Sequence, residues 1–188
     1  MTTVVFVRHA QSAPSAELPE ADWPLSEKGQ AQAQALVPVL GALGVDALVS
    51  SPFLRTRETL RPFAETSGLS LRVDEDLRER KLTGGWLPDI AAVEAAVRRM
   101  FAEPAFAFPG GESALACIAR FEKAVGRVVA AHPDRVVAVA SHGGVLSHFM
   151  AGHHGGPPFD FWRAMLTPHI FVFDCSGPPR WIGEQTLE

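Results

Sequence analysis

The sequence predicts an α/β protein built as a three-layer αβα sandwich with a mostly parallel central sheet of five to six strands. Apolar runs at residues 4–7 and 136–140 have the length and β-branched content of buried parallel strands. A helix-like segment at residues 51–60 follows directly after a strand-like run at residues 45–50. Buried strands that alternate with helices are typical of a sheet covered on both faces.

Length and composition indicate a single domain that spans residues 1–188. A chain of 188 residues buries roughly 70% of the surface that its unfolded form exposes, so a hydrophobic core alone is sufficient for folding. The formal net charge is -4, whereas a sequence-independent nucleic-acid binder needs a broad basic surface. We therefore expect no nucleic-acid partner, and an anion site would have to be a local pocket.

The sequence has no pattern of a membrane or export segment. No stretch approaches the ~20 consecutive apolar residues of a membrane span, and the first residues lack the charged and apolar regions of a signal peptide. Cys117 and Cys175 have neither redox nor metal spacing, so we expect both to be buried as small hydrophobic residues. A cytoplasmic protein without a membrane partner is the expectation.

The first predicted strand ends in two residues suited to phosphate chemistry. Arg8 and His9 follow the apolar run 4–7, and ligands of open α/β sheets bind at the carboxyl ends of strands. A guanidinium can hold phosphate oxygens through paired hydrogen bonds, and an imidazole can attack phosphorus. Taken alone, the pair is explained more simply as two solvated polar residues at the end of a strand.

The first predicted helix follows a loop at residues 13–24. Ser26 suits its N-cap, and Glu27 suits the positive end of the helix dipole. Gly29 lowers the stability of a helix. We therefore expect another part of the backbone to approach Gly29 closely.

The next strand-like run, at residues 45–50, leads straight into a helix. Ser51 is predicted as the N-cap, followed by a proline, and this places free backbone N–H groups at the carboxyl edge of the sheet. Arg55 and Thr59 share one face of this helix, whereas Arg57 points elsewhere. Arg55 is the candidate for a second phosphate clamp, and Arg57 is expected to be a surface charge.

The middle of the chain is predicted to form a short strand, a charged loop and two helices, at residues 69–73, 74–81, 91–101 and 114–131. Charged runs of this kind are usually solvated. Trp86 follows two glycines and could form the wall of a pocket. Phe106 and Phe108 are either core residues or rings that face the substrate, and the core is the favoured alternative.

The strand predicted at residues 135–140 repeats the arrangement of the amino terminus. It is followed by Ser141, His142 and two glycines that open a helix. A second strand-end histidine, beside Arg8 and Arg55, is much less probable by chance than any one of these residues. Two further strands are predicted at residues 169–174 and 180–186.

Together these motifs resemble those of the histidine phosphatase superfamily, the phosphoglycerate mutase-like proteins. The matches span most of the chain, from residue 4 to residue 145, and their joint occurrence is highly specific. In chain order they are Arg8 and His9; Leu25, Ser26, Gly29, Gln32 and Ala33; Ser51, Pro52, Arg55, Thr56 and Thr59; Leu77 and Glu79; Gly110, Gly111, Glu112 and Ser113; and Ser141, His142, Gly143 and Gly144. Ala10 departs from the family pattern, which usually has glycine at this position.

The resemblance implies a phosphoenzyme mechanism. His9 would be the nucleophile, while Arg8, Arg55 and His142 would hold the phosphoryl oxygens. Phosphoryl transfer develops charge on three oxygens, and fixed cations can stabilise that charge without a metal. We therefore expect neither a metal nor another cofactor. His9 must be neutral to attack, whereas a bound dianion should favour the charged form of His142.

The resemblance also implies an acid and further contacts with the substrate. Glu79 would protonate the leaving oxygen and then activate water, with Asp76 as the rival for this role. A backbone N–H near Gly143 is a further candidate donor. Gln11 or Ser12 would contact phosphate in place of an asparagine of the family.

The function predicted is therefore a metal-independent phosphomonoester hydrolase that acts on a small phosphorylated substrate. A mutase-like phosphotransferase and a catalytically weak domain that binds a phosphorylated ligand are the alternatives. A metallohydrolase that uses His142, His148, His153 and His154 is less favoured, because the spacing matches no ligand motif. His153 and His154 are expected in a surface loop. The identity of the substrate and the formation of a homodimer stay open.

Overall fold

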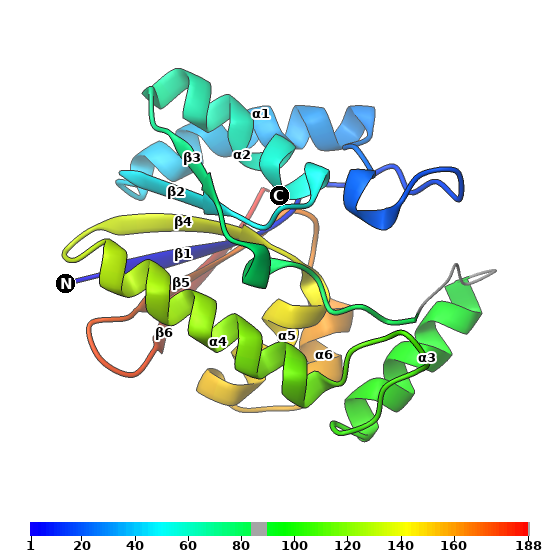
Figure 1. Ribbon diagram of the computed structural model, residues 1–188. Helices are drawn as coiled ribbons and strands as arrows, with labels where there is room; N and C mark the ends of the chain where they lie inside the picture. Colours follow the sequence, from blue (N-terminus) through cyan, green and yellow to red (C-terminus); the bar gives the residue numbers. More distant parts are fainter. Residues whose placement is uncertain (84–89, 188) are drawn as a thin grey trace.

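The computed structural model describes residues 1–83 and 90–187, which form three layers (Figure 1). Trp86 lies outside the described residues. The strands are β1 (Thr3–Arg8), β2 (Ala47–Ser50), β3 (Leu71–Val73), β4 (Val136–Ser141), β5 (His169–Asp174) and β6 (Arg180–Thr186). The helices are α1 (Glu27–Ala42), α2 (Leu54–Ser67), α3 (Ile90–Ala102), α4 (Ala114–Ala131), α5 (Gly143–His154) and α6 (Pro158–Ala164), with two short 3-10 helices, η1 (Glu20–Asp22) and η2 (Glu75–Leu77).

The sheet has six strands in the order β3-β2-β4-β1-β5-β6. β1 and β2 each pair with β4 in parallel, and β2 also pairs with β3 in parallel. β5 runs antiparallel to both β1 and β6. The predicted α/β class and the mostly parallel sheet are confirmed.

β1 lies in the middle of the sheet and contributes to both hydrophobic cores. Val4 and Phe6 pack in the core formed with α4 and α5, whereas Val5 and Val7 pack in the core formed with α1 and α2. This division follows from the alternation of side chains along a strand. In Figure 1, α1 and α2 accordingly lie above the sheet, and α4, α5 and α6 lie below it.

Several predicted boundaries agree with the structure. Ser26 is the N-cap of α1, and its hydroxyl accepts a hydrogen bond from the Gly29 N–H. Gly29 itself lies against the Gln11 carbonyl, where a Cβ would clash. The strand predicted at residues 180–186 is β6, and the helix predicted at residues 114–131 is α4. Cys117 and Cys175 are buried free thiols.

Two local predictions are wrong. The helix after β2 begins at Leu54 with Phe53 at its N-cap, not at Ser51, because the Ser51 N–H still donates to the Ala140 carbonyl of β4 at 2.9 Å and extends the sheet pairing past the end of β2. His153 and His154 form the end of α5 rather than a loop, since the two glycines that indicate a turn follow the pair and end the helix.

The carboxyl ends of β1, β2 and β4 meet at one edge of the sheet, because these strands are parallel. In Figure 1 this edge faces the right-hand side, where the loop that contains η1 and the helix α3 lie.

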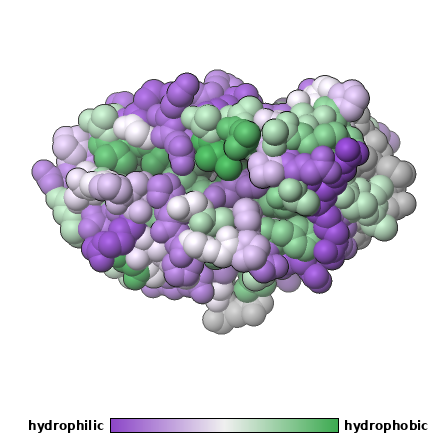
Figure 2. Space-filling view, turned by 90° about the horizontal axis from the view of Figure 1, so that it is seen from below, coloured by the Kyte–Doolittle hydropathy of each residue, from purple (hydrophilic) through white to green (hydrophobic). Residues whose placement is uncertain are grey.

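Within the described residues, no helix is both long and apolar enough to cross a membrane. Seen from below, the surface carries hydrophobic patches separated by hydrophilic side chains (Figure 2).

Candidate active site

The carboxyl edge of the sheet brings together four of the predicted site residues. Arg8 ends β1 and His9 follows it, while His142 follows β4, and Arg55 lies in the first turn of α2. The rings of His9 and His142 are 5.4 Å apart between centroids, and Arg55 Nε lies 3.3 Å from His9 Nε2. His142 is fully buried, and Arg55 and His9 are 3% and 8% exposed.

The hydrogen bonds of His9 fix which of its nitrogens carries the proton. Nδ1 lies 2.8 Å from the Ala10 carbonyl oxygen, which can only accept a hydrogen bond. Nδ1 therefore carries the proton, and the Nε2 lone pair accepts the Arg55 Nε–H at 3.3 Å. Burial, together with the charges of Arg55 and Arg8, lowers the pKa of His9 to about 3. The imidazole is thus neutral and nucleophilic at physiological pH.

The Arg55 guanidinium is held by hydrogen bonds to His9 and Glu20 and by two aromatic rings. Its Nε donates to His9, Nη1 donates to the Glu20 carbonyl at 2.7 Å, and Nη2 donates to the Glu20 carboxylate at 3.0 Å. The guanidinium carbon lies 4.8 Å from the ring centroid of Phe53 and 5.6 Å from that of Trp23. These contacts fix the plane of the guanidinium before any ligand binds.

One ring nitrogen of His142 makes a hydrogen bond, and the other makes none among the described residues. Nε2 lies 2.7 Å from the Ser51 hydroxyl, and Nδ1 is buried without a hydrogen-bond partner in the described parts of the chain. Burial, followed by the charges of Arg55 and His9, lowers the pKa of His142 well below its usual value. In the tautomer in which Ser51 donates to Nε2, the proton of a neutral His142 is on Nδ1, which can then donate to a ligand.

Arg8 is anchored at one end of its guanidinium. Nη1 donates to the carbonyls of Met165 and Leu166, whereas Nε is buried and has no partner among the described residues. The guanidinium lies directly over Gly143, where a Cβ would come within 2.9 Å of Cζ. Glycine at this position therefore allows Arg8 to lie against the start of α5.

Glu79 lies at the amino end of α5. One carboxylate oxygen accepts the Gly144 N–H at 2.9 Å, and the other accepts the N–H groups of Val145 and Arg80 at 2.9 and 2.7 Å. The positive end of the α5 dipole favours a carboxylate here. Glu79 also acts electrostatically on Arg8 and Arg55, so the three side chains belong to one charged cluster.

Asp76, the rival for the acid role, has different surroundings. Its carboxylate pairs with Arg127 at 2.8 Å and with Arg78 at 3.4 Å. The hydrogen bond from Arg127 lowers the pKa of Asp76. Asp76 is thus paired with Arg127 and Arg78, whereas Glu79 belongs to the cluster with Arg8 and Arg55. The choice of Glu79 as the acid stays a prediction.

A buried ion pair holds the segment that carries Glu79. Arg120 pairs with Glu112 at 2.6 Å and is 8% exposed. The same guanidinium donates to the backbone carbonyls of Asp76, Arg78 and Glu79. Since the backbone of residues 76–79 is fixed in this way, the position of the Glu79 side chain is fixed as well.

The remaining predicted contacts lie around the first loop. The Gln11 side chain accepts a hydrogen bond from the Ser26 hydroxyl at 2.8 Å, and Ser12 pairs with Leu25 in an isolated bridge. Their contact with phosphate stays a prediction. Ala10 does not have a positive φ, so its Cβ is not strained. Its side chain packs with Leu25 and Ala33 in a small core.

The contacts of three residues at the site do not follow from the sequence patterns. Ser51 and Thr59 belong to the motifs, but their sequence positions indicate only a helix cap and a face shared with Arg55. Glu20 lies in a loop without periodicity that would single it out. The Thr59 hydroxyl accepts the Ala10 N–H at 3.0 Å and donates to the Arg55 carbonyl at 2.7 Å.

Two aromatic residues for which the core is the favoured expectation lie outside the hydrophobic core clusters. Phe106 and Phe108 are half-buried and contact each other. Arg99 lies 3.8 Å from the ring centroid of Phe106, and this cation covers the aromatic pair in place of a hydrophobic core.

The histidines of the metallohydrolase alternative do not converge. His148 is buried, and its Nε2 lies 2.8 Å from Arg80 Nη1, whereas His142 contacts Ser51. In the described residues, no group of three or more histidine, cysteine, aspartate or glutamate side chains is arranged to hold a metal ion.

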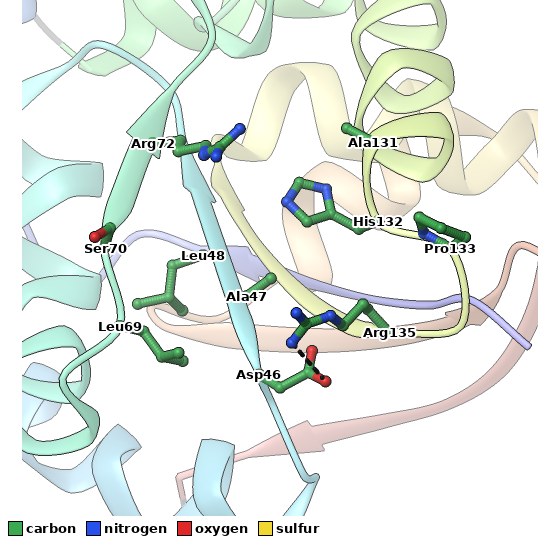
Figure 3. A pocket seen from close by; sticks show the side chains of 10 residues that line it. All are labelled: Asp46, Ala47, Leu48, Leu69, Ser70, Arg72, Ala131, His132, Pro133 and Arg135. Carbon is green, nitrogen blue, oxygen red and sulfur yellow. Dashed lines mark ion pairs between the residues drawn. The ribbon is translucent and has the colours of Figure 1, made fainter.

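A separate cavity of about 530 Å³ lies at the opposite, amino edge of β2, β3 and β4. Figure 3 shows Arg72, His132 and Arg135 along its wall, with Arg135 paired to Asp46 at 3.3 Å. Arg8, His9, Arg55 and His142 do not line this cavity. The candidate active site is the cluster at the carboxyl edge, because these four residues come together there.

Comparison with known proteins gives consistent similarities. Residues 4–173 match the histidine phosphatase superfamily, branch 1. Glucosyl-3-phosphoglycerate phosphatase of Mycobacterium tuberculosis is 34% identical over 164 residues, which cover 79% of this chain and 73% of the relative. A probable phosphoglycerate mutase of Cronobacter sakazakii is 28% identical over 174 residues, or 88% of this chain and 81% of the relative. A solved structure of the mycobacterial glucosyl-3-phosphoglycerate phosphatase with inorganic phosphate has a TM-score of 0.76 at 28% identity and covers 96% of this chain and 94% of its own.

Proposed function

Because the chain belongs to the histidine phosphatase superfamily, branch 1, we propose that it hydrolyses phosphate monoesters through a phosphohistidine on His9. The observation that carries the proposal is a pair of buried nitrogens beside the nucleophile, Arg8 Nε and His142 Nδ1, that have no hydrogen-bond partner in the described chain. His9 Nε2 is the unprotonated ring nitrogen and accepts the Arg55 Nε–H until a ligand takes that donor. A tetrahedral anion would satisfy both donors, which are otherwise costly to bury.

The first step forms the covalent intermediate. His9 Nε2 attacks phosphorus, the bond from phosphorus to the ester oxygen breaks, and a protonated Glu79 gives its proton to the leaving alcohol. The Arg55 Nε–H, which donates to His9 in the free enzyme, turns to a phosphoryl oxygen. Arg8 and His142 donate to the other oxygens, on which charge develops.

The second step releases phosphate. Glu79, now ionised, accepts a proton from water, and the water oxygen attacks phosphorus as the phosphorus–nitrogen bond breaks. His9 returns to its neutral form with the proton still on Nδ1, because the Ala10 carbonyl holds it there. The cations and N–H donors of the chain supply the stabilisation of charge in both steps, so the proposed mechanism needs no metal.

Hydrolysis of p-nitrophenyl phosphate in the presence of a chelator tests the proposal. We expect turnover by the wild type, none by His9→Ala, and an acid-labile phosphoprotein in rapidly quenched reactions. Arg55→Ala should lose about 10²–10³ in kcat, because one fixed donor to the developing charge is removed. The matched control is Arg57→Ala, two residues away on the exposed face of α2, which should retain activity.

Two results would redirect the assignment. Transfer of the phosphoryl group to a second alcohol without net release of phosphate would indicate a mutase. Binding of phosphate without turnover of any ester would indicate a binding domain.

The cytoplasmic location and a homodimer remain predictions, which cell fractionation and the mass in solution would test.

A further inference from the structure

Glu20 occupies a position that the proposed mechanism does not use. It belongs to η1, in the loop between β1 and α1, and its carboxylate pairs with Arg55 Nη2 at 3.0 Å. The carbonyl of the same residue accepts from Arg55 Nη1 at 2.7 Å. Glu20 therefore holds the outer side of a buried guanidinium whose inner Nε faces the nucleophile His9. Without a bound ligand, two of the three guanidinium nitrogens of Arg55 already donate to Glu20.

The second carboxylate changes the charge of the site. Arg55 is buried and Arg8 is half-buried, and Glu79 and Glu20 offset the charges of these two cations. Burial raises the pKa of Glu20, Arg55 opposes the rise, and Glu79 adds to it. The two carboxylates thus act on each other across the site. Lys81 also acts on Glu20, but it is exposed, so water screens its charge.

This arrangement distinguishes between leaving groups. The phosphoryl group is common to every ester, and Arg8 and His142 provide donors for it. Selection between substrates therefore depends on the alcohol part of the ester. An alcohol with a carboxylate near phosphorus would place a further negative charge beside Glu20. An ammonium group at the same place would be attracted to the Glu20 carboxylate, whose side chain is 42% exposed and therefore accessible to a ligand.

Resting on the function proposed above, we propose that Glu20 is a specificity-determining residue that selects phosphate monoesters of amino alcohols over those of hydroxy acids. Its carboxylate tempers the charge of Arg55, which alone would attract any anion, and it offers a counter-ion to a cationic leaving group. Glu20 also positions Arg55, but that role is the same for every ester.

Three esters with short carbon chains test the inference. Phosphoethanolamine carries an ammonium group, ethyl phosphate is neutral beyond its phosphoryl group, and 2-phosphoglycolate carries a carboxylate. We expect kcat/KM of the wild type to fall in that order, with at least a tenfold ratio between the first and the last. Competition with p-nitrophenyl phosphate gives inhibition constants, so even a slowly hydrolysed ester can be ranked.

The variant Glu20→Gln removes the charge but keeps an oxygen that can accept from Arg55. We expect it to reduce the ratio of phosphoethanolamine to 2-phosphoglycolate at least tenfold, mainly through better use of 2-phosphoglycolate. Glu17→Gln, in the same loop at an exposed position, should leave the ratio unchanged.

Two results would overturn the inference. An equal change of kcat/KM for all three esters in Glu20→Gln would show that the residue only positions Arg55. A wild type that ranks 2-phosphoglycolate equal to or above phosphoethanolamine would show that the pocket does not select against negative charge. Both differ from failure of the proposed function, in which p-nitrophenyl phosphate itself would not be hydrolysed or would be hydrolysed equally by His9→Ala.

Discussion

Three buried histidines lie beside arginine side chains, and this fixes their protonation. His9 and His142 lie near Arg8 and Arg55, and His148 contacts Arg80. Burial, aided by the arginine charges, lowers the pKa of His9 to about 3 and that of His148 to about 4. The folded chain therefore keeps these imidazoles neutral at pH values where the unfolded chain protonates them.

The stability of the fold should depend on pH for this reason. Below the usual histidine pKa of about 6.5, the unfolded state binds protons that the folded state does not, so the free energy of unfolding falls as the pH falls towards 4. We expect lower stability at pH 5 than at pH 7.5 in urea denaturation. His148→Gln keeps an acceptor for Arg80 and should show a smaller difference. Equal free energies at both pH values would contradict the assignment of neutral histidines.

Single residues could be predicted where a side chain follows a recognisable strand. Arg8, His9 and His142 stand directly after buried apolar runs, and Arg55 shares its helix face with Thr59. Glu20 could not be found in this way, because its position depends on the path of a loop, which follows from contacts distant in the sequence.

At the level of elements, α5 shows why two adjacent glycines follow His142. A Cβ on Gly143 would meet the Arg8 guanidinium at 2.9 Å, and one on Gly144 would meet the Glu79 carboxylate at 2.7 Å. The start of this helix therefore has room for the two charged groups only because it lacks side chains. The sequence pattern indicated a helix that opens with small residues, but not which charges lie over them.

Gly144→Ala should displace the Glu79 carboxylate and lower kcat about 10²-fold, because general acid–base catalysis contributes on this scale. Steady-state hydrolysis of p-nitrophenyl phosphate measures the effect. The matched control lies on the same helix, since a Cβ on Gly152 meets nothing within 4 Å. Gly152→Ala should keep full activity and stabilise the fold by about 0.5–1 kcal/mol. Similar loss of activity in both variants would point to a general effect on α5.

Elements with strong local signals were predicted almost to the residue, as for α4 and β6. The start of α2 was not, because the Ser51 backbone still pairs with Ala140 of β4, a contact that is distant in the sequence. The order of the strands follows from non-local pairing, so the sequence indicated the parallel sheet but not its arrangement.

On the scale of the whole molecule, Phe6 joins β1 to the helices below the sheet. Its ring lies 5.9, 4.9 and 5.6 Å, between centroids, from the rings of Phe121, Phe149 and Phe173. Phe6→Ala should lower the free energy of unfolding by about 3–5 kcal/mol, measured by urea denaturation with an unchanged m value. Ile182→Ala, on β6 and 49% exposed in the wild type, should change it by less than about 0.5 kcal/mol. Equal effects would show that the cluster around Phe6 is not central to the core.

The central place of β1 has a consequence for the newly made chain. Its neighbours in the sheet are β4 and β5, so the first strand to leave the ribosome has no partner until residues 136–141 have been added. Synthesis of that stretch takes on the order of ten seconds. During this time an apolar strand remains uncovered, and we expect chaperone dependence and aggregation in the cell to depend on the delay between the first strand and the fourth.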